Sequence, residues 1–310
     1  MAKKKQKKKN AGPPQALVRL SQVMIVKNEE KNIEKALSWA KRVAFEQIVI
    51  DTGSTDRTIE IAERMGAKVV EFEWVNDFSK AKNFAIEQAT GNWIAFLDAD
   101  EYFTEINTQK LMVFLKRIMS DANMKANFHV INCAWVNVDE EGNRFSIQDQ
   151  ERIFRNLPSI RYIGRIHERL GVEKANIVEV DEIEIIHTGY SHTALKETGK
   201  AARNVELLRL DLKDRPDDLN IKSYLADSLK MSEDSKDQEE ADALFKEAID
   251  NGNIVIPDLL KKAYLHYIQK IIGDQSKIDE CVELCRKACS AIPGDPDLNN
   301  LYTQVRGNRA

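Results

Sequence analysis

The fold is decided by a strand, a turn and a helix that follow one another in residues 47–66, QIVIDTGSTDRTIEIAERMG. Residues 47–50 form a short, mostly apolar run that predicts a strand, and the run ends at Asp51. Asp56 can cap the helix that follows, and Gly66 suits the end of that helix. A strand that leads directly into a helix is the unit from which α/β sheets are built.

The same alternation continues on both sides of this unit, from residue 17 to about residue 119. Further strands are expected at residues 23–26, 68–72 and 93–97, and helices at residues 29–41, 79–89 and 111–119. Alternating strands and helices predict a mostly parallel sheet in a three-layer α/β domain. Between residues 128 and 187, shorter alternating stretches indicate additional strands and loops, which we expect to complete the sheet and to form one wall of a site.

The last third of the chain is predicted to be helical and contains a loose repeat. Pro-Asp-Asp-Leu at residues 216–219 recurs as Pro-Asp-Leu at residues 257–259 and 296–298, about 40 residues apart each time. Two helices per unit resemble tetratricopeptide repeats, although the period exceeds the usual 34 residues, and a plain helical bundle is the alternative. We therefore expect a basic tail at residues 1–16, an α/β domain at 17–192 and a helical domain at 193–310.

Composition narrows the class of protein. Of the 310 residues, 43% are hydrophobic and 31% are charged, which excludes a disordered or fibrous chain. Six lysines lie between Lys3 and Lys9, and without their charges the net charge changes from −4 to −10. A basic nucleic-acid surface is therefore not expected, and the tail is either solvated or contacts an anionic membrane.

Nothing in the sequence predicts a membrane-spanning helix or a secretory signal, and only four cysteines are present. The expected location is the cytoplasm, with peripheral membrane contact through the tail as the alternative.

Polar and acidic residues follow three of the expected strands. Asn28 and Glu29 come after the first strand, Asp51 after the second, and Asp98 and Asp100 after the fourth. In an open α/β sheet these strand ends face one crevice, where ligands bind. Two carboxylates one residue apart can hold a hard divalent cation, which would bridge the phosphates of a nucleoside diphosphate. The GxxxxGK[ST] and GxGxxG patterns are absent, which argues against P-loop NTPases and dinucleotide dehydrogenases.

These motifs resemble those of the inverting glycosyltransferases of family 2, which have the GT-A fold. The matching pieces are Val-Lys-Asn-Glu at residues 26–29, Asp-Thr-Gly-Ser-Thr-Asp at 51–56, Lys-Ala-Lys-Asn at 80–83 and Asp-Ala-Asp at 98–100. The resemblance covers residues 20 to about 190. It implies transfer of a sugar from a nucleotide-diphosphate donor, such as UDP-glucose, to a glycan, lipid or peptide acceptor.

The resemblance also implies a role for each matching residue. Asp51 corresponds to the acid that binds the nucleobase, and Asn28 and Glu29 correspond to residues that contact base and ribose. Asp98 corresponds to the acid near ribose and metal, and Asp100 to the principal ligand of the metal ion, which the resemblance implies to be Mn²⁺ or Mg²⁺.

Four further residues are expected near the nucleotide. Lys82 and Asn83 would line its pocket from a helix. For Lys82, a surface lysine without a role in binding is the alternative. Arg152 and Arg155 would neutralise the leaving diphosphate, or else pair with acids on the surface.

Residues 152–155, 164–168 and 187–190 resemble a bacterial subgroup that includes lipopolysaccharide-core glucosyltransferases and bacteriocin-peptide glycosyltransferases. Glu168 is the candidate general base, and His167 either replaces it in that role or orients it. His187 ends the last expected strand and would complete a metal site with Asp98 and Asp100. For both histidines a structural role is the alternative.

Cys281, Cys285 and Cys289 recur every four residues, so they share one helix face. Packing between helices is favoured over a metal site, because no fourth ligand lies nearby in the sequence. The helical domain would bind the acceptor or form a homodimer. Two other functions remain open: a helical-repeat scaffold with a vestigial transferase domain, and a nucleotidyltransferase.

Overall fold

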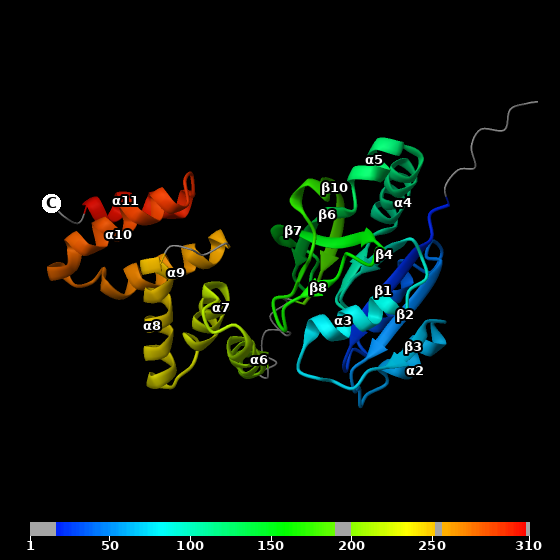
Figure 1. The fold of residues 1–310 in the computed structure, drawn as a ribbon, viewed down its shortest axis with the longest axis horizontal. Coiled ribbons are helices and arrows are strands. Elements are labelled where there is room, and N and C mark those ends of the chain that lie inside the picture. Colours follow the sequence, from blue (N-terminus) through cyan, green and yellow to red (C-terminus); the bar gives the residue numbers. More distant parts are fainter. Residues whose placement is uncertain (1–16, 190–199, 252–255, 308–310) are drawn as a thin grey trace, which may run out of the picture. The chain divides into compact units, whose positions relative to one another are not determined.

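The computed structural model describes residues 17–189, 200–251 and 256–307 of the chain (Figure 1). The chain divides into two compact units, Met1–Glu197 and Thr198–Ala310. The predicted basic tail and the predicted domain boundary near residue 192 lie outside the described residues.

The first unit is built on an eight-stranded mixed sheet with the order β3-β2-β1-β4-β7-β6-β10-β5. Its strands are β1 (Leu20–Val26), β2 (Glu46–Asp51), β3 (Lys68–Glu71), β4 (Trp93–Phe96), β5 (Glu101–Phe103), β6 (Val130–Val138), β7 (Arg144–Arg155) and β10 (Ile177–His187). Strands β1 to β4 are parallel, as predicted. In the second half β7 runs antiparallel to both β4 and β6, β10 runs parallel to β6, and β5 runs antiparallel to β10.

Helices pack on both faces of this sheet, which gives the three predicted layers. They are α1 (Ile33–Ser38), α2 (Thr58–Arg64), α3 (Phe78–Glu87), α4 (Glu105–Ser120) and α5 (Ala122–Asn127). Alternate residues of β4 point to opposite faces: Phe96 packs against α3, and Ala95 lies in the core that contains α4. The helix α1 is shorter than predicted, because residues 30–32 form a turn, in which the Asn32 N–H donates to the carbonyl oxygen of Glu29, and the helix ends at Ser38.

The order of the strands reverses between β1 and β4. From β1 the chain moves outward to β2 and β3 and then returns to β4 on the other side of β1. Ligands bind at such a switch point, outside the carboxyl ends of the strands. Because β7 is antiparallel to β4 and β6, and β10 is parallel to β6, the carboxyl end of β10 lies at the same sheet edge as that of β4.

A small hairpin adds to this edge. It consists of β8 (Tyr162–Ile163) and β9 (Arg169–Leu170), and its loop contains the left-handed residues Gly164 (φ 106°) and His167 (φ 52°). The backbone N–H of Phe78, the first residue of α3, donates to the carbonyl oxygen of Arg165 in that loop at 2.8 Å. The loop is therefore fastened to the start of α3.

The second unit is helical, as predicted. Its helices are α6 (Lys200–Asp214), α7 (Leu219–Leu229), α8 (Ser235–Asn251), α9 (Pro257–Ile271), α10 (Ile278–Ala291) and α11 (Pro296–Gly307). Each Pro-Asp-Leu motif starts a helix, with Asp218 capping α7 and Pro257 and Pro296 as first residues of α9 and α11. Consecutive helices contact one another and α7 also contacts α9, which is the pattern of a helical repeat array.

The cysteines of α10 belong to the core of this unit. Cys281 and Cys285 are buried among apolar side chains of α9, α10 and α11, and Cys289 is packed against them. None of the helices within the described residues combines the length and the apolar character needed to cross a membrane.

Candidate active site

The loops that follow β1 and β2 hold each other in place. The left-handed Asn28 (φ 58°) accepts a hydrogen bond from the Thr55 N–H at 2.7 Å and donates its own N–H to the Ser54 hydroxyl at 2.9 Å. The N–H of Glu29 donates to the hydroxyl of Thr58 at 2.7 Å. The two predicted nucleotide contacts therefore lie at the expected strand end, where they also fix the geometry of the neighbouring loop.

Asp51 ends β2 and is only 3% exposed. Its Oδ2 accepts the backbone N–H groups of Gly53 and Ser54, both at 2.9 Å, and Gly53 adopts the positive φ of 105° that this turn requires. Its Oδ1 is buried and has no hydrogen-bond partner among the described residues. A buried polar atom without a partner costs about 1–3 kcal/mol, so a ligand N–H that reaches Oδ1 would bind favourably.

Lys82 projects from α3 into a buried position between two carboxylates. Its Nζ lies 2.6 Å from an Oε1 of Glu168 and 3.9 Å from an Oδ1 of Asp98. The same nitrogen lies over the rings of Phe96 and Tyr162, 5.3 and 4.9 Å from their centres. Burial would lower the pKa of Lys82, but the charges of Glu168 and Asp98 outweigh it and raise the pKa. Lys82 is thus a fixed cation and not a surface lysine.

Arg152 connects the partly exposed Asp98 to the buried carboxylate of Glu101. Its guanidinium lies 2.8 Å from Oδ2 of Asp98 and 2.6 Å from Oε1 of Glu101. Glu101 also accepts the Asp98 N–H at 2.9 Å and the indole N–H of Trp135 at 2.7 Å. Burial would raise the pKa of Asp98, but Lys82 and Arg152 lower it to about 2. Burial raises the pKa of Glu101 against the opposing charge of Arg152.

His187 and Asp100 meet at the carboxyl end of β10. The His187 Nε2 lies 3.3 Å from an oxygen of Asp100, and its Nδ1 lies 2.6 Å from the amide oxygen of Asn137. Trp135 stacks on the imidazole, with ring centres 4.1 Å apart. The contact with Asn137 orients the ring, so that Nε2 points toward the Asp100 carboxylate. Imidazole nitrogens and carboxylate oxygens are both common ligands of divalent metal ions, so the pair could contribute to a metal site.

Gly189 forms the wall beside this pair. A Cβ atom at this position would overlap Oδ2 of Asp100 and would lie 2.6 Å from Nε2 of His187. Only a residue without a side chain can bring its backbone this close to the two candidate ligands.

The three metal ligands predicted from the sequence do not form one set. Within the part of the chain that the structure describes, no group of three or more His, Cys, Asp or Glu side chains is placed to hold a metal ion. Asp98 is occupied by Arg152 and Lys82, whereas Asp100 and His187 face each other. A metal ion held by this pair would take its remaining ligands from water and phosphate, as Mg²⁺ commonly does.

Comparison with known proteins identifies the family of the α/β unit. Residues 21–164 match the description "Glycosyl transferase family 2", a span that includes the loops after β1, β2 and β4 and the whole of α3. The α/β unit belongs to glycosyltransferase family 2. The family assignment and the α/β fold followed by helices are thus confirmed.

Relatives of the family 2 unit extend into the helical unit. A TPR repeat-containing protein of Synechococcus elongatus is 33% identical over 235 residues, which cover 71% of this chain and 55% of that protein. The SPbeta prophage-derived glycosyltransferase SunS of Bacillus subtilis is 30% identical over 236 residues, 74% of this chain and 52% of SunS. The chain thus spans about half the length of these relatives. S. aureus TarS 1-349, solved with UDP-GlcNAc, is 14% identical with a TM-score of 0.49, covering 94% of this chain and 92% of that chain.

Two predicted site residues have other roles in the family 2 unit. The amide of Asn83 donates to the carbonyl oxygen of Tyr162 at 2.9 Å and accepts its N–H at 2.8 Å, so Asn83 fastens the hairpin to α3. Arg155 pairs with Trp93 at the start of β4, which is the sheet edge opposite Asp98, and donates to the carbonyl oxygen of Lys125. We therefore leave Arg155 out of the candidate site of the family 2 unit.

His167, the second candidate base, is exposed and precedes Glu168 in the hairpin loop. Sequence reasoning assigned no role to Glu101, Trp135, Asn137 or Gly189. Two local signals were available: Glu101 follows Asp100 directly, and Gly189 lies in the stretch 187–190 that resembles the bacterial subgroup.

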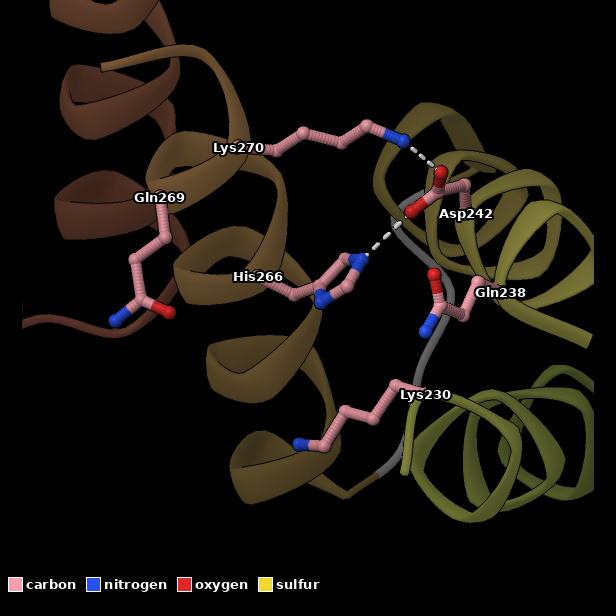
Figure 2. A pocket seen from close by; sticks show the side chains of 6 residues that line it. All are labelled: Lys230, Gln238, Asp242, His266, Gln269 and Lys270. Carbon is pink, nitrogen blue, oxygen red and sulfur yellow. Dashed lines mark hydrogen bonds and ion pairs between the residues drawn. The ribbon is translucent and has the colours of Figure 1, made fainter. Parts of the chain in front are cut away.

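The helical unit holds a second cluster of charged side chains, shown in Figure 2 between α8 and α9. Asp242 of α8 lies 2.7 Å from Nε2 of His266 and forms an ion pair with Lys270, both of which belong to α9. Burial and the charge of Lys230 lower the pKa of His266. This cluster fastens α8 to α9 and belongs to the second unit.

Proposed function

We propose that the chain is a metal-dependent, inverting glycosyltransferase that moves a sugar from a nucleoside-diphosphate donor to an acceptor hydroxyl or thiol. The observation that carries the proposal is the Asp100–His187 pair, which lies at the same sheet edge as the Asp98–Arg152 ion pair. The family 2 assignment of the α/β unit supports the reaction class.

The nucleobase would bind at Asp51. Its Oδ1 is a buried, oriented acceptor, and the imide N–H of uracil is a donor of matching chemistry. This makes UDP the expected nucleotide, with Asn28 and Glu29 beside it on the neighbouring loop. Asp98 is held in one position by Lys82 and Arg152. Its carboxylate can therefore accept a hydrogen bond from a ribose hydroxyl without a change of conformation.

Asp100 and His187 would hold Mn²⁺ or Mg²⁺. When bound, such an ion neutralises the charge that develops on the departing diphosphate. Arg152 can add to this effect, because its buried Nε–H has no hydrogen-bond partner among the described residues and guanidinium groups bind phosphate oxygens strongly.

Glu168 would act as the general base. Its carboxylate is held by the ion pair with Lys82 at 2.6 Å and lies in the hairpin loop, next to His167. The acceptor hydroxyl or thiol gives its proton to Glu168 and forms a bond to the anomeric carbon. The bond from that carbon to the diphosphate oxygen breaks on the opposite side, which inverts the configuration.

A hydrolysis screen tests the proposal. The chain would be incubated with a panel of nucleotide sugars, with Mn²⁺, with Mg²⁺ or with EDTA. Metal-dependent release of nucleoside diphosphate supports a glycosyltransferase, whereas release of pyrophosphate indicates a nucleotidyltransferase. Absence of both turnover and metal-dependent UDP binding by calorimetry would indicate a scaffold with a vestigial transferase domain.

A further inference from the structure

Residues 144–150 of β7 form an open strand edge within the described structure. In the described structure, β7 pairs with β4 only at residues 153–155, whereas β6 pairs with it almost from end to end. Residues 144–150 therefore have β6 on one side and no described strand on the other. Five of these seven residues are exposed. We call the side of residues 144–150 that faces away from β6 the β7 edge.

The chemistry of the β7 edge selects one kind of partner. An unpaired edge presents N–H and C=O groups in a row, and only another polypeptide can match this row along its length. The same stretch of β7 carries two apolar side chains, Phe145 and Ile147, which are 54% and 60% exposed. Their spacing of two places them on one face, where the alternate side chains of an added strand would contact them.

The β7 edge leads into the candidate active site. Arg152 follows it by two residues and contacts Asp98. Glu151, between the β7 edge and Arg152, interacts with Arg169 of β9. Arg169 directly follows the candidate base Glu168 in the sequence. A strand that pairs along residues 144–150 spans roughly 20 Å and ends beside these groups.

We infer that the acceptor is a polypeptide, bound in extended form as an added strand on the β7 edge. This inference rests on the proposed function, because the edge matters only if a sugar is transferred at the site it reaches. The added strand would bring a Ser, Thr or Cys side chain to the anomeric carbon. Its proton passes to Glu168 and the nucleoside diphosphate leaves. Glycan and lipid acceptors lack the alternating donors and acceptors that the edge would pair with.

The test uses fluorescent synthetic peptides of about ten residues, with Val and Thr alternating around a central Ser, Thr or Cys. Binding is measured by anisotropy, transfer by mass spectrometry, and donor hydrolysis separately. Peptides N-methylated at alternate positions, in each of the two registers, probe the backbone. We expect methylation in one register to weaken binding at least tenfold and methylation in the other register to have little effect, because only one side of a strand faces the edge.

Variants of the chain provide the matched control. Ile147→Glu should weaken peptide binding at least tenfold and leave donor hydrolysis unchanged. Ile106→Glu, an equally apolar and exposed position on α4, should change neither measurement. Equal binding of both methylated registers, or transfer to oligosaccharide or lipid acceptors only, would overturn the inference.

Two further outcomes separate this inference from others. A dimer that Ile147→Glu converts to a monomer would show that a second copy of the chain covers the edge, which overturns the peptide assignment. Register-dependent peptide binding without any donor hydrolysis would support the edge and reject the proposed function.

Discussion

Two clusters in this molecule combine histidine, aspartate and basic residues, and their charges are arranged differently. In the helical unit, Asp242 is paired with the imidazole of His266 and with the ammonium of Lys270 (Figure 2). In the family 2 unit, Asp100 faces the Nε2 of His187. The helical cluster neutralises its carboxylate with a lysine and joins two helices. In the strand-end pair, Asp100 forms no ion pair with a lysine or arginine among the described residues, and the two side chains are of types that bind metal ions.

The surroundings extend this contrast. The strand-end cluster combines the carboxylates of Asp98, Asp100, Glu101 and Glu168 with the cations of Lys82 and Arg152. Four negative and two positive groups leave a surplus of negative charge, which a divalent cation would balance. The residue types alone do not separate a binding site from a structural ion pair; the balance of charges and the burial do.

The largest expected effect comes from Asp100→Ala. Loss of one of two candidate metal ligands should reduce metal-dependent donor hydrolysis on the order of 10³-fold, since metal charge stabilisation is worth several kcal/mol. Mn²⁺ binding, measured by calorimetry or electron paramagnetic resonance, should fall in parallel. The matched control is Asp242→Ala in the helical cluster, which should retain turnover. Full activity of Asp100→Ala would show that this residue is not a metal ligand.

Asp51→Asn is expected to have the next largest effect. The buried Oδ1 would lose its charge, and a charge-assisted hydrogen bond of about 1.5–3 kcal/mol corresponds to roughly 10- to 100-fold weaker UDP binding. Calorimetry with UDP and with pyrophosphate, both in the presence of Mn²⁺, separates base from phosphate recognition. Only UDP binding should weaken, and an equal loss for pyrophosphate would show that Asp51 does not contact the base.

Much of this site could be predicted, because strand ends are local features. The apolar runs and the acids that end them lie side by side in the sequence, so the strand-end positions of Asp51, Asp98 and Asp100 follow from the sequence alone. The direction of β7 is not local. It is antiparallel to β4, which brings Arg152 to Asp98 and carries Arg155 to the opposite edge.

The supporting contacts also escaped prediction for a physical reason. Trp135 meets Glu101 across 34 positions of the chain and Asn137 meets His187 across 50. Such pairings depend on the order of strands in the sheet, which leaves no pattern at a fixed spacing. The exposed stretch of β7 is similar, because it follows from the short length of β4 and not from any motif.

Gly189→Ala should have an intermediate effect that is confined to the strand-end cluster. The added Cβ would overlap the Asp100 carboxylate and push it from His187. Changes in the groups that position a metal ligand lower metal affinity by about 10- to 100-fold, so Mn²⁺ binding should weaken by this factor. The unfolding temperature should barely change. Gly273→Ala, where an added Cβ meets no atom within 4 Å, is the control in the helical unit. Unaltered Mn²⁺ affinity of Gly189→Ala would place the metal elsewhere.

The smallest expected effect concerns the helical cluster and pH. Burial and Lys230 lower the pKa of His266, so the unfolded chain binds the proton more tightly than the folded chain. The stabilising contribution of the neutral imidazole is therefore fully present above the unfolded pKa and is lost as the pH falls through the folded value. Urea unfolding followed between about pH 7.5 and pH 5 should show a shallower loss of stability for His266→Gln than for the natural chain, a difference of about 1 kcal/mol or less. Donor hydrolysis at neutral pH should be the same for both proteins. A difference of the opposite sign, or a loss of hydrolysis in His266→Gln, would mean that this cluster does more than join α8 to α9.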